Sequence, residues 1–160
     1  ADISVLEAKY VDNDFHARYN AKGKNYIYRI YNSEIKNPFL ADRALQIPRE
    51  LDLGRMNEFC KRICGKHDFY GFSSSGRTVT DTVRTITDCS VYKEGKEIIL
   101  SVTADGFLYN MVRIITGTAI AVSDGLINPE DTEKIILSKE RDKAGATVAP
   151  TGLYLNKVFY

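Results

Sequence analysis

Residues 107–122 make up a strongly apolar segment that contains one charged residue, Arg113. Because the segment is apolar on nearly every helical face, it predicts a buried helix. An arginine in such a helix needs an anion, since an unpaired buried charge costs about 3–5 kcal/mol. Asn110 lies three residues earlier on the same helical face, where it can orient the guanidinium. Two interpretations stay open: a structural ion pair with an acid elsewhere in the fold, or a site where Arg113 meets a carboxylate or phosphate.

The remaining periodicity predicts a single α+β domain. Residues 24–31 alternate so that Tyr26, Tyr28 and Ile30 share one face of a strand. We expect strands over residues 3–11, 24–31, 44–47, 83–92, 97–104 and 152–160, and helices over residues 51–65, 107–122 and 128–139. Paired strands with interspersed helices, rather than strict βαβ alternation, favour α+β with a mixed or antiparallel sheet flanked by helices.

Composition excludes several function classes. The formal net charge of +1 does not by itself indicate binding to a highly charged polymer. A surface that binds nucleic acid must therefore come from basic side chains that cluster locally. No signal peptide or membrane-spanning apolar run is visible, which predicts no membrane partner. Three cysteines, an odd number, indicate free thiols in a reducing compartment such as the cytoplasm.

The cysteines and histidines do not have the spacing of a metal site. Cys60, Cys64 and His67 lie close together in the sequence, but Cys89 is isolated, and a structural zinc site usually has two close ligand pairs. Cys60 also lies on the apolar face of its predicted helix. The thiols are therefore predicted to pack in the core, with no metal bound.

Two segments have the composition of an RNA-binding surface. Residues 14–29 interleave aromatic side chains with Arg18, Lys22 and Lys24, the pattern needed to hold phosphates and an unstacked base. The same residues also suit a sheet with core tyrosines and cations at its edge, and both interpretations stay open. The small-residue loop 71–78 brings Arg77 near Arg84 and can contact phosphate, although a solvated loop is the plain alternative. That loop lacks the lysine and spacing of a P-loop.

Four segments, read in order, resemble a known family. They are Phe-His-Ala-Arg at 15–18, Lys-Asn-Tyr-Ile-Tyr at 24–28, residues 107–117 with Met-Val-Arg and a glycine four residues on, and Gly-Leu-Tyr-Leu at 152–155. The chain resembles the second half of the bacterial tRNA pseudouridine synthase A family over essentially its whole length. The resemblance implies that residues 1–160 are one C-terminal domain of pseudouridine synthase-like fold. An opening at Ala1 within a strand-like pattern also suggests a piece of a larger protein.

The resemblance implies the isomerisation of uridine to pseudouridine at neighbouring sites in the anticodon stem-loop of tRNA, without a metal or organic cofactor. It makes Arg113 the partner of a catalytic aspartate and Tyr26 the residue that stacks on the flipped uracil and transfers a proton. Leu153 becomes the apolar wall of the base pocket. Candidate phosphate contacts are Arg18, Lys22, Lys24, Arg77 and Arg84.

One part of the family pattern is missing. The catalytic aspartate of the family belongs to a Gly-Arg-Thr-Asp motif in the first half, whereas here Gly76-Arg77-Thr78 is followed by Val79. Asp81 is in a different loop and is not predicted to replace that aspartate. The resemblance therefore implies an absent N-terminal domain as partner, a homodimer at full length and an inactive isolated chain. A stand-alone, non-catalytic RNA-binding module of the same fold is the alternative.

Overall fold

In the computed structural model, which describes residues 3–76 and 79–160, one mixed sheet is the framework of the domain. Its strands in the described part of the chain are β1 (Gly23–Asn32), β2 (Leu45–Ile47), β3 (Gly65–Asp68), β4 (Val83–Glu94), β5 (Glu97–Ala104) and β6 (Leu153–Phe159). They follow the order β2-β1-β5-β4-β3, and β6 also pairs with β1. Among the strands of the described residues, only the short β1–β2 pairing is parallel. The α+β prediction is confirmed.

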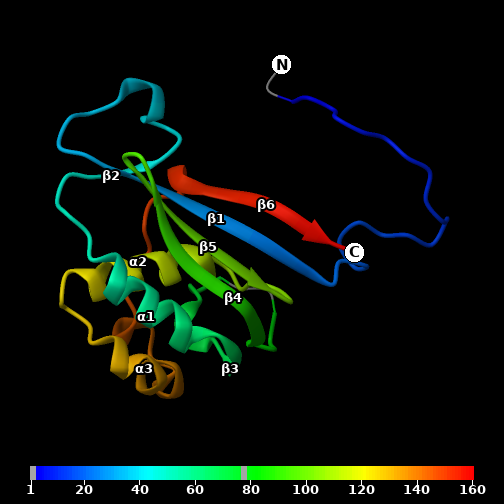
Figure 1. The fold of residues 1–160 in the computed structure, drawn as a ribbon. Coiled ribbons are helices and arrows are strands. Elements are labelled where there is room, and N and C mark those ends of the chain that lie inside the picture. The colour runs from blue at the N-terminus through cyan, green and yellow to red at the C-terminus, as the bar shows by residue number, and fades with distance from the viewer. Residues whose placement is uncertain (1–2, 77–78) are drawn as a thin grey trace.

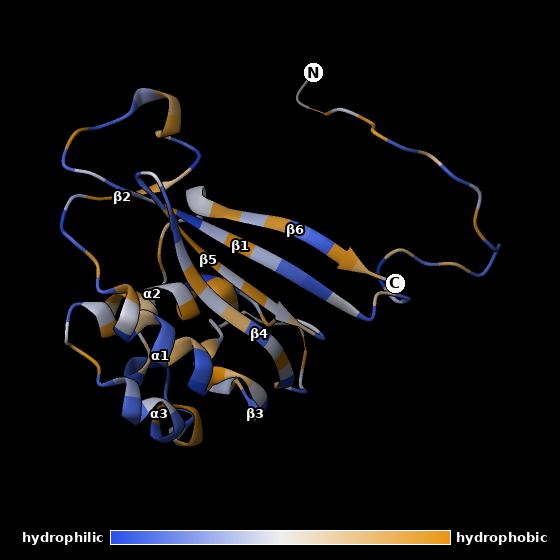
Figure 2. Cartoon of the chain, in the orientation of Figure 1, coloured by the Kyte–Doolittle hydropathy of each residue, from blue (hydrophilic) through white to orange (hydrophobic). Residues whose placement is uncertain are grey.

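Strand β1 is the centre of this arrangement. Strand β5 pairs along most of its length, so β6 and β2 must share its other edge, β6 along its first half and β2 along its last three residues. Tyr28 and Ile30 are fully buried, while Tyr26, on the same face, is half-buried. The predicted alternation of this strand is thereby confirmed, and Figure 2 shows bands of hydrophobic and hydrophilic residues along β1 and β6.

Helices cover one face of the sheet (Figure 1). They are α1 (Leu53–Ile63), α2 (Met111–Ser123) and α3 (Thr132–Ser138). Helix α1 begins where the Asp52 carboxylate accepts a hydrogen bond from the Arg55 amide, 3.0 Å away, and buries Met56, Phe59 and Ile63. The helix predicted over residues 51–65 is confirmed, and it spans Leu53–Ile63. No helix in the described part of the chain has the length and hydropathy needed to cross a bilayer.

Two predictions of secondary structure are wrong. Residues 3–11, expected as a strand, are exposed and belong to no regular element. Within the described residues no neighbouring strand pairs with them, and a strand needs such hydrogen bonds to persist. The apolar helix begins at Met111 rather than at residue 107, because Asn110 takes the left-handed conformation with φ 61° and turns the chain just before it.

Candidate active site

The turn before α2 sets the position of Arg113. Asparagine enters the left-handed region at lower cost than most residues, so Asn110 can hold the sharp entry to the helix. The Met111 amide closes this turn on the Leu108 carbonyl at 3.1 Å. The Asn110 side chain then lies beside the guanidinium one turn later, as the spacing predicts, and accepts a hydrogen bond from Arg113 Nη1 at 2.8 Å. Its own amide nitrogen donates to Ser74 Oγ at 3.1 Å.

Arg113 is held by neutral oxygen atoms rather than by an acid. Its Nε donates to the Val148 carbonyl at 2.7 Å, in addition to the bond with Asn110. Across residues 3–76 and 79–160, no carboxylate forms an ion pair with it, and its Nη2 has no hydrogen-bond partner. The side chain is half-buried, not enclosed. The structural ion pair, one of the two open interpretations, is absent from the described chain.

A loop packed against α2 supplies the Val148 carbonyl. Gly145 and Gly117 permit this packing: a Cβ on Gly117 would lie 1.8 Å from the Ala146 oxygen, and one on Gly145 would lie 2.4 Å from the Thr118 nitrogen. The Gly145 amide also donates to Thr118 Oγ1 at 2.9 Å. The backbone-to-backbone approach carries the following residues to the start of α2, where they meet Arg113.

The same loop is tied to the sheet through Tyr28. Its hydroxyl donates to the Ala149 carbonyl at 2.6 Å. Burial raises the pKa of Tyr28 to about 12, although the positive charge of Arg113 acts in the opposite direction. Tyr28 therefore stays a neutral donor at physiological pH, and the carbonyls of Val148 and Ala149 connect α2 to β1.

These elements surround an open pocket of about 300 Å³. It is lined by Tyr26, Phe107, Leu108, Tyr109, Asn110, Met111, Val112, Arg113 and Leu153. The Tyr26 ring meets Phe107 edge-on, with centroids 5.1 Å apart and an interplanar angle of 82°. No hydrogen bond of the described residues uses the Tyr26 hydroxyl, which leaves it available to a ligand. A guanidinium, an aromatic ring and an aliphatic wall can together hold a planar polar base.

Comparison with known proteins identifies the family of the chain. The family model for tRNA pseudouridine synthase matches residues 59–160. The chain belongs to the tRNA pseudouridine synthase family. A relative from Clostridium perfringens, named tRNA pseudouridine synthase A 2, is 46% identical over 159 residues, which cover 99% of this chain. Relatives named tRNA pseudouridine synthase A from Acetivibrio thermocellus and Lacticaseibacillus casei are 45% and 41% identical over 99% of the chain. In each case this chain spans 65% of the relative's length.

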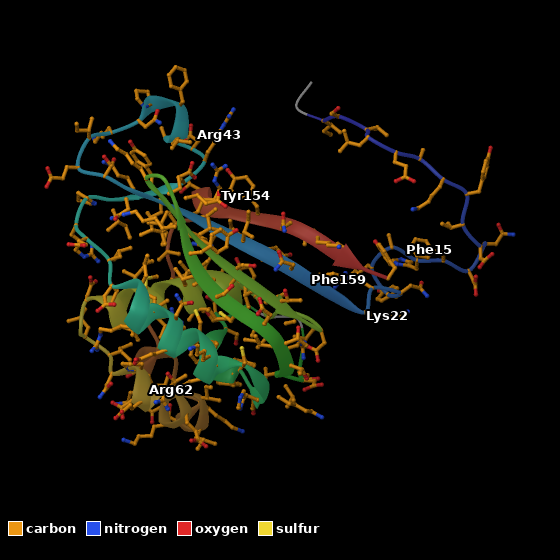
Figure 3. All side chains as sticks on the ribbon, in the orientation of Figure 1. Phe15, Lys22, Arg43, Arg62, Tyr154 and Phe159 are labelled. Atoms are coloured by element: carbon orange, nitrogen blue, oxygen red, sulfur yellow. The ribbon has the colours of Figure 1, made fainter. Side chains whose placement is uncertain are left out.

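The residues that the family resemblance singled out fall into two groups. Arg113, Tyr26 and Leu153 come from α2, β1 and β6, and the structure brings them to one pocket. The candidate phosphate contacts that the structure describes, Arg18, Lys22, Lys24 and Arg84, do not line it. Arg18 is exposed with its guanidinium 5.8 Å from the Tyr19 ring centroid, and Lys22 lies near Phe159 at the end of the sheet (Figure 3). Their binding role stays a prediction.

The other candidate phosphate contacts are more scattered. Lys24 precedes Tyr26 by two residues on the same face of β1. Arg84 lies against Gly106, where an added Cβ would be 3.2 Å from Arg84 Nε. Arg77 lies outside the described residues. Asp81 accepts a hydrogen bond from the Val83 amide at 2.9 Å and does not line the pocket.

Two parts of the site were not predicted from the sequence, Phe107 and the Val148 carbonyl. Phe107 lies inside the quoted motif, but only the fold shows it against Tyr26. The Val148 carbonyl has no sequence signature, because every residue carries one. The sequence feature that comes nearest to indicating this contact is the pair Gly117 and Gly145, because glycines permit the backbones of two segments to approach closely.

The thiols pack as predicted. Cys60 and Cys89 are buried and Cys64 is half-buried, and all three are free. A hydrogen bond with Cys60, together with burial, raises the pKa of the Cys89 thiol. The described residues contain no cluster of histidine, cysteine and acidic side chains that would hold a metal ion.

Proposed function

We propose that this chain forms one side of an active site that converts uridine to pseudouridine in the anticodon stem-loop of tRNA. The observation that carries the proposal is Arg113, a guanidinium oriented by two neutral oxygens with Nη2 unpaired at a pocket. A cation oriented in this way at an open pocket can bind an anion, and none of the described residues supplies one. Membership of the tRNA pseudouridine synthase family indicates which anion to expect.

In this proposal the anion is the aspartate of a Gly-Arg-Thr-Asp motif outside this chain. About a third of each relative's length has no counterpart here, and we assign the motif to that part, ahead of the matched region. A fixed guanidinium beside the aspartate lowers the pKa of its carboxyl group and orients it toward the substrate. Arg113 therefore acts on the carboxylate rather than on the base.

Tyr26 and Leu153 hold the base during the reaction. The isomerisation breaks the bond between the ribose and a uracil nitrogen, turns the uracil, and joins the ribose to a ring carbon, which loses its proton to the replaced nitrogen. The Tyr26 ring offers a stacking surface, and its hydroxyl transfers that proton. Leu153 limits water around the detached base. No step requires a metal or organic cofactor.

The remaining expectations concern the intact protein. Arg18, Lys22, Lys24, Arg77 and Arg84 contact backbone phosphates of the tRNA. The intact protein is a homodimer in the cytoplasm, a reducing compartment that suits the three free cysteines.

The test is pseudouridine formation in an unmodified tRNA transcript. Two proteins are compared: the 160-residue chain, and a chimera in which the uncovered portion of the Clostridium perfringens relative precedes this chain. We expect activity from the chimera only. Activity of the chain alone would place the nucleophile here and overturn the division of the site. If both bind tRNA without forming pseudouridine, the chain is a non-catalytic RNA-binding module.

A further inference from the structure

Helix α2 begins with a charge of the sign that its dipole disfavours. Arg113 lies in the first turn, where the backbone amides give the helix end a partial positive charge. That turn contains no acidic residue. An acid just before the helix would offset both charges, and aspartate is favoured there as much as asparagine. The chain has Asn110 at that position, so the guanidinium has a neutral neighbour.

The Asn110 side chain does not cap the helix. An asparagine in this place commonly accepts a hydrogen bond from an amide of the first turn, but here the side chain makes no such bond. Its Oδ1 instead accepts a hydrogen bond from Arg113 Nη1 at 2.8 Å. The side chain therefore holds the guanidinium and leaves the helix end without a side-chain cap.

Ser74 fixes which end of the amide faces Arg113. A guanidinium has donors only, so it must meet the oxygen of the Asn110 amide, and the amide nitrogen then points away. That nitrogen donates to Ser74 Oγ at 3.1 Å, and the Ser74 backbone amide donates to the Tyr109 carbonyl at 3.2 Å. Ser74 precedes β4, whereas Tyr109 and Asn110 form the turn before α2. Two segments 36 residues apart thus hold the amide in one orientation.

The contacts of Arg113 orient the guanidinium without neutralising it. Nη1 donates to Asn110 and Nε donates to the Val148 carbonyl, and both acceptors are uncharged. Among the described residues, no carboxyl or imidazole group lines the pocket. The positive charge of Arg113 therefore stays available to an anion that enters the pocket.

We propose that Asn110, itself held by Ser74, is a positioning residue that aims the Arg113 guanidinium at the pocket and leaves its charge uncompensated. The inference rests on the proposed function, because that function brings a carboxylate to Arg113. An acid at position 110 would reach the same Nη1 atom and form an ion pair with it. The incoming carboxylate would then meet a neutralised cation and a second negative charge, and both effects disfavour its ionised form. A neutral amide avoids them.

Asn110→Asp in the 160-residue chain tests the contact without catalysis. The two side chains have nearly the same shape, and aspartate also tolerates the left-handed conformation with φ 61°. Carbon-13 NMR follows the titration of the introduced carboxyl group, alone and combined with Arg113→Met. The guanidinium should hold the pKa of that group at least about one unit lower than it is in the double variant. Equal pKa values in the two proteins overturn the contact between positions 110 and 113.

The same substitution in the chimera tests the effect on catalysis. Asn110→Asp should move the acid limb of the single-turnover rate to higher pH by at least about one unit, because the incoming carboxyl group gains a proton more readily. The melting temperature should not fall, since the introduced carboxylate suits the helix dipole and pairs with Arg113. An unmoved acid limb overturns the proposal, and a lower melting temperature with it makes Asn110 a structural residue only.

The acid limb can be assigned to the incoming carboxyl group. The titratable side chains that line the pocket with Arg113 are Tyr26 and Tyr109, and Tyr28 is near enough to interact with its charge. These are phenols, which do not titrate in the acid range. The segment of residues 144–152, which packs against α2, contains no titratable side chain.

Ser74→Ala tests the second contact of the amide. Without the Ser74 hydroxyl the Asn110 side chain can rotate, so the guanidinium is less well oriented but keeps its charge. We expect the turnover number of the chimera to fall about threefold to tenfold with an unchanged KM and an unmoved acid limb. Ser74→Thr keeps a hydroxyl and should restore most of the rate. An unchanged turnover number for Ser74→Ala overturns the role given to Ser74.

The two kinds of measurement separate this inference from the proposed function. If the wild-type chimera folds but forms no pseudouridine, the proposed function fails. The carboxyl titration in the 160-residue chain still decides whether position 110 controls the charge of Arg113, and it does so even if the chimera does not fold. If the chimera is active and Asn110→Asp leaves its acid limb in place, the positioning role fails and the proposed function stands.

Discussion

The backbone of Gly145 lies directly against α2 at Gly117, with no side chain between them. Each glycine occupies a place where a Cβ would come within 2.5 Å of the other segment's backbone. This approach aligns the next residues of the loop with the first turn of α2, where the Val148 carbonyl accepts from Arg113 Nε. A contact between two glycines thus sets the orientation of a guanidinium at the pocket.

Gly117→Ala should destabilise the domain. The added methyl would lie 1.8 Å from the Ala146 oxygen, so the loop must move away from α2. We expect a loss of about 3 kcal/mol in the free energy of unfolding, measured by urea denaturation. The matched control is Gly54→Ala, since Gly54 is exposed in the first turn of α1 and its Cβ would meet only the Asp52 side chain. Gly54→Ala should raise the free energy of unfolding of the domain by at most about 1 kcal/mol. Equal effects of the two variants would show that the close approach does not matter.

Arg113→Met should abolish catalysis while keeping the fold. In the chimera we expect the turnover number to fall about 10²–10³-fold, because the carboxylate loses the cation that keeps it ionised. Arg113→Lys is the matched control: it keeps the charge but cannot reproduce both the Nε and Nη1 hydrogen bonds, so an intermediate rate is expected. Circular dichroism verifies folding. Turnover by Arg113→Met near the wild-type value would rule out the proposed pairing.

Tyr26→Phe separates stacking from proton transfer. The substitution keeps the ring that meets Phe107 edge-on and removes a hydroxyl with no hydrogen-bond partner among the described residues. If the hydroxyl transfers a proton, single-turnover rates in the chimera should fall about 10²-fold or more while tRNA affinity stays unchanged. Tyr26→Leu, which also removes the ring, should weaken both quantities. An unchanged rate for Tyr26→Phe would leave stacking as the contribution of this residue.

The stability of the domain should depend on Tyr28 at alkaline pH. Its pKa is about 12 in the folded chain and 10.0 for an ordinary tyrosine, so between these values the unfolded chain has released the proton and the folded chain has kept it. Stability therefore falls as pH rises through this interval. Tyr28→Phe loses the hydrogen bond to Ala149, worth about 1 kcal/mol at neutral pH, and it also lacks this pH dependence because phenylalanine has no proton to release. Urea midpoints of both proteins from pH 8 to pH 11 should converge above pH 10; a constant difference would contradict the prediction.

Much of the secondary structure could be read from local patterns. The spacing of Met56, Phe59 and Ile63 predicts α1, and Gly95 predicts the turn between β4 and β5. The short strand β3 was not predicted, because its residues Gly-Lys-His-Asp carry no alternation of apolar and polar side chains. The N-terminal strand was predicted but is absent, because periodicity reports a preference and not the presence of a partner.

The contacts of the candidate site also divide into those that the sequence predicts and those that it does not. The bond between Asn110 and Arg113 was predicted from their spacing of three residues, and it forms although Asn110 precedes α2 in the left-handed conformation. The bond between Arg113 and Val148 was not, because 35 residues separate them and its acceptor is a backbone carbonyl. Family motifs pointed to Tyr26 and Leu153, but did not say that Phe107 packs against the tyrosine.

The sequence by itself determined the helices, the turn between β4 and β5 and the apolar face of β1. These properties depend on hydrogen bonds and side-chain spacings within a few residues. Only the tertiary structure decided that β6 and β2 share one edge of β1 and that the loop after Gly145 reaches Arg113. It also decided that no described acid pairs with that arginine. Such contacts join residues far apart in the chain, and they form only when the whole core has packed.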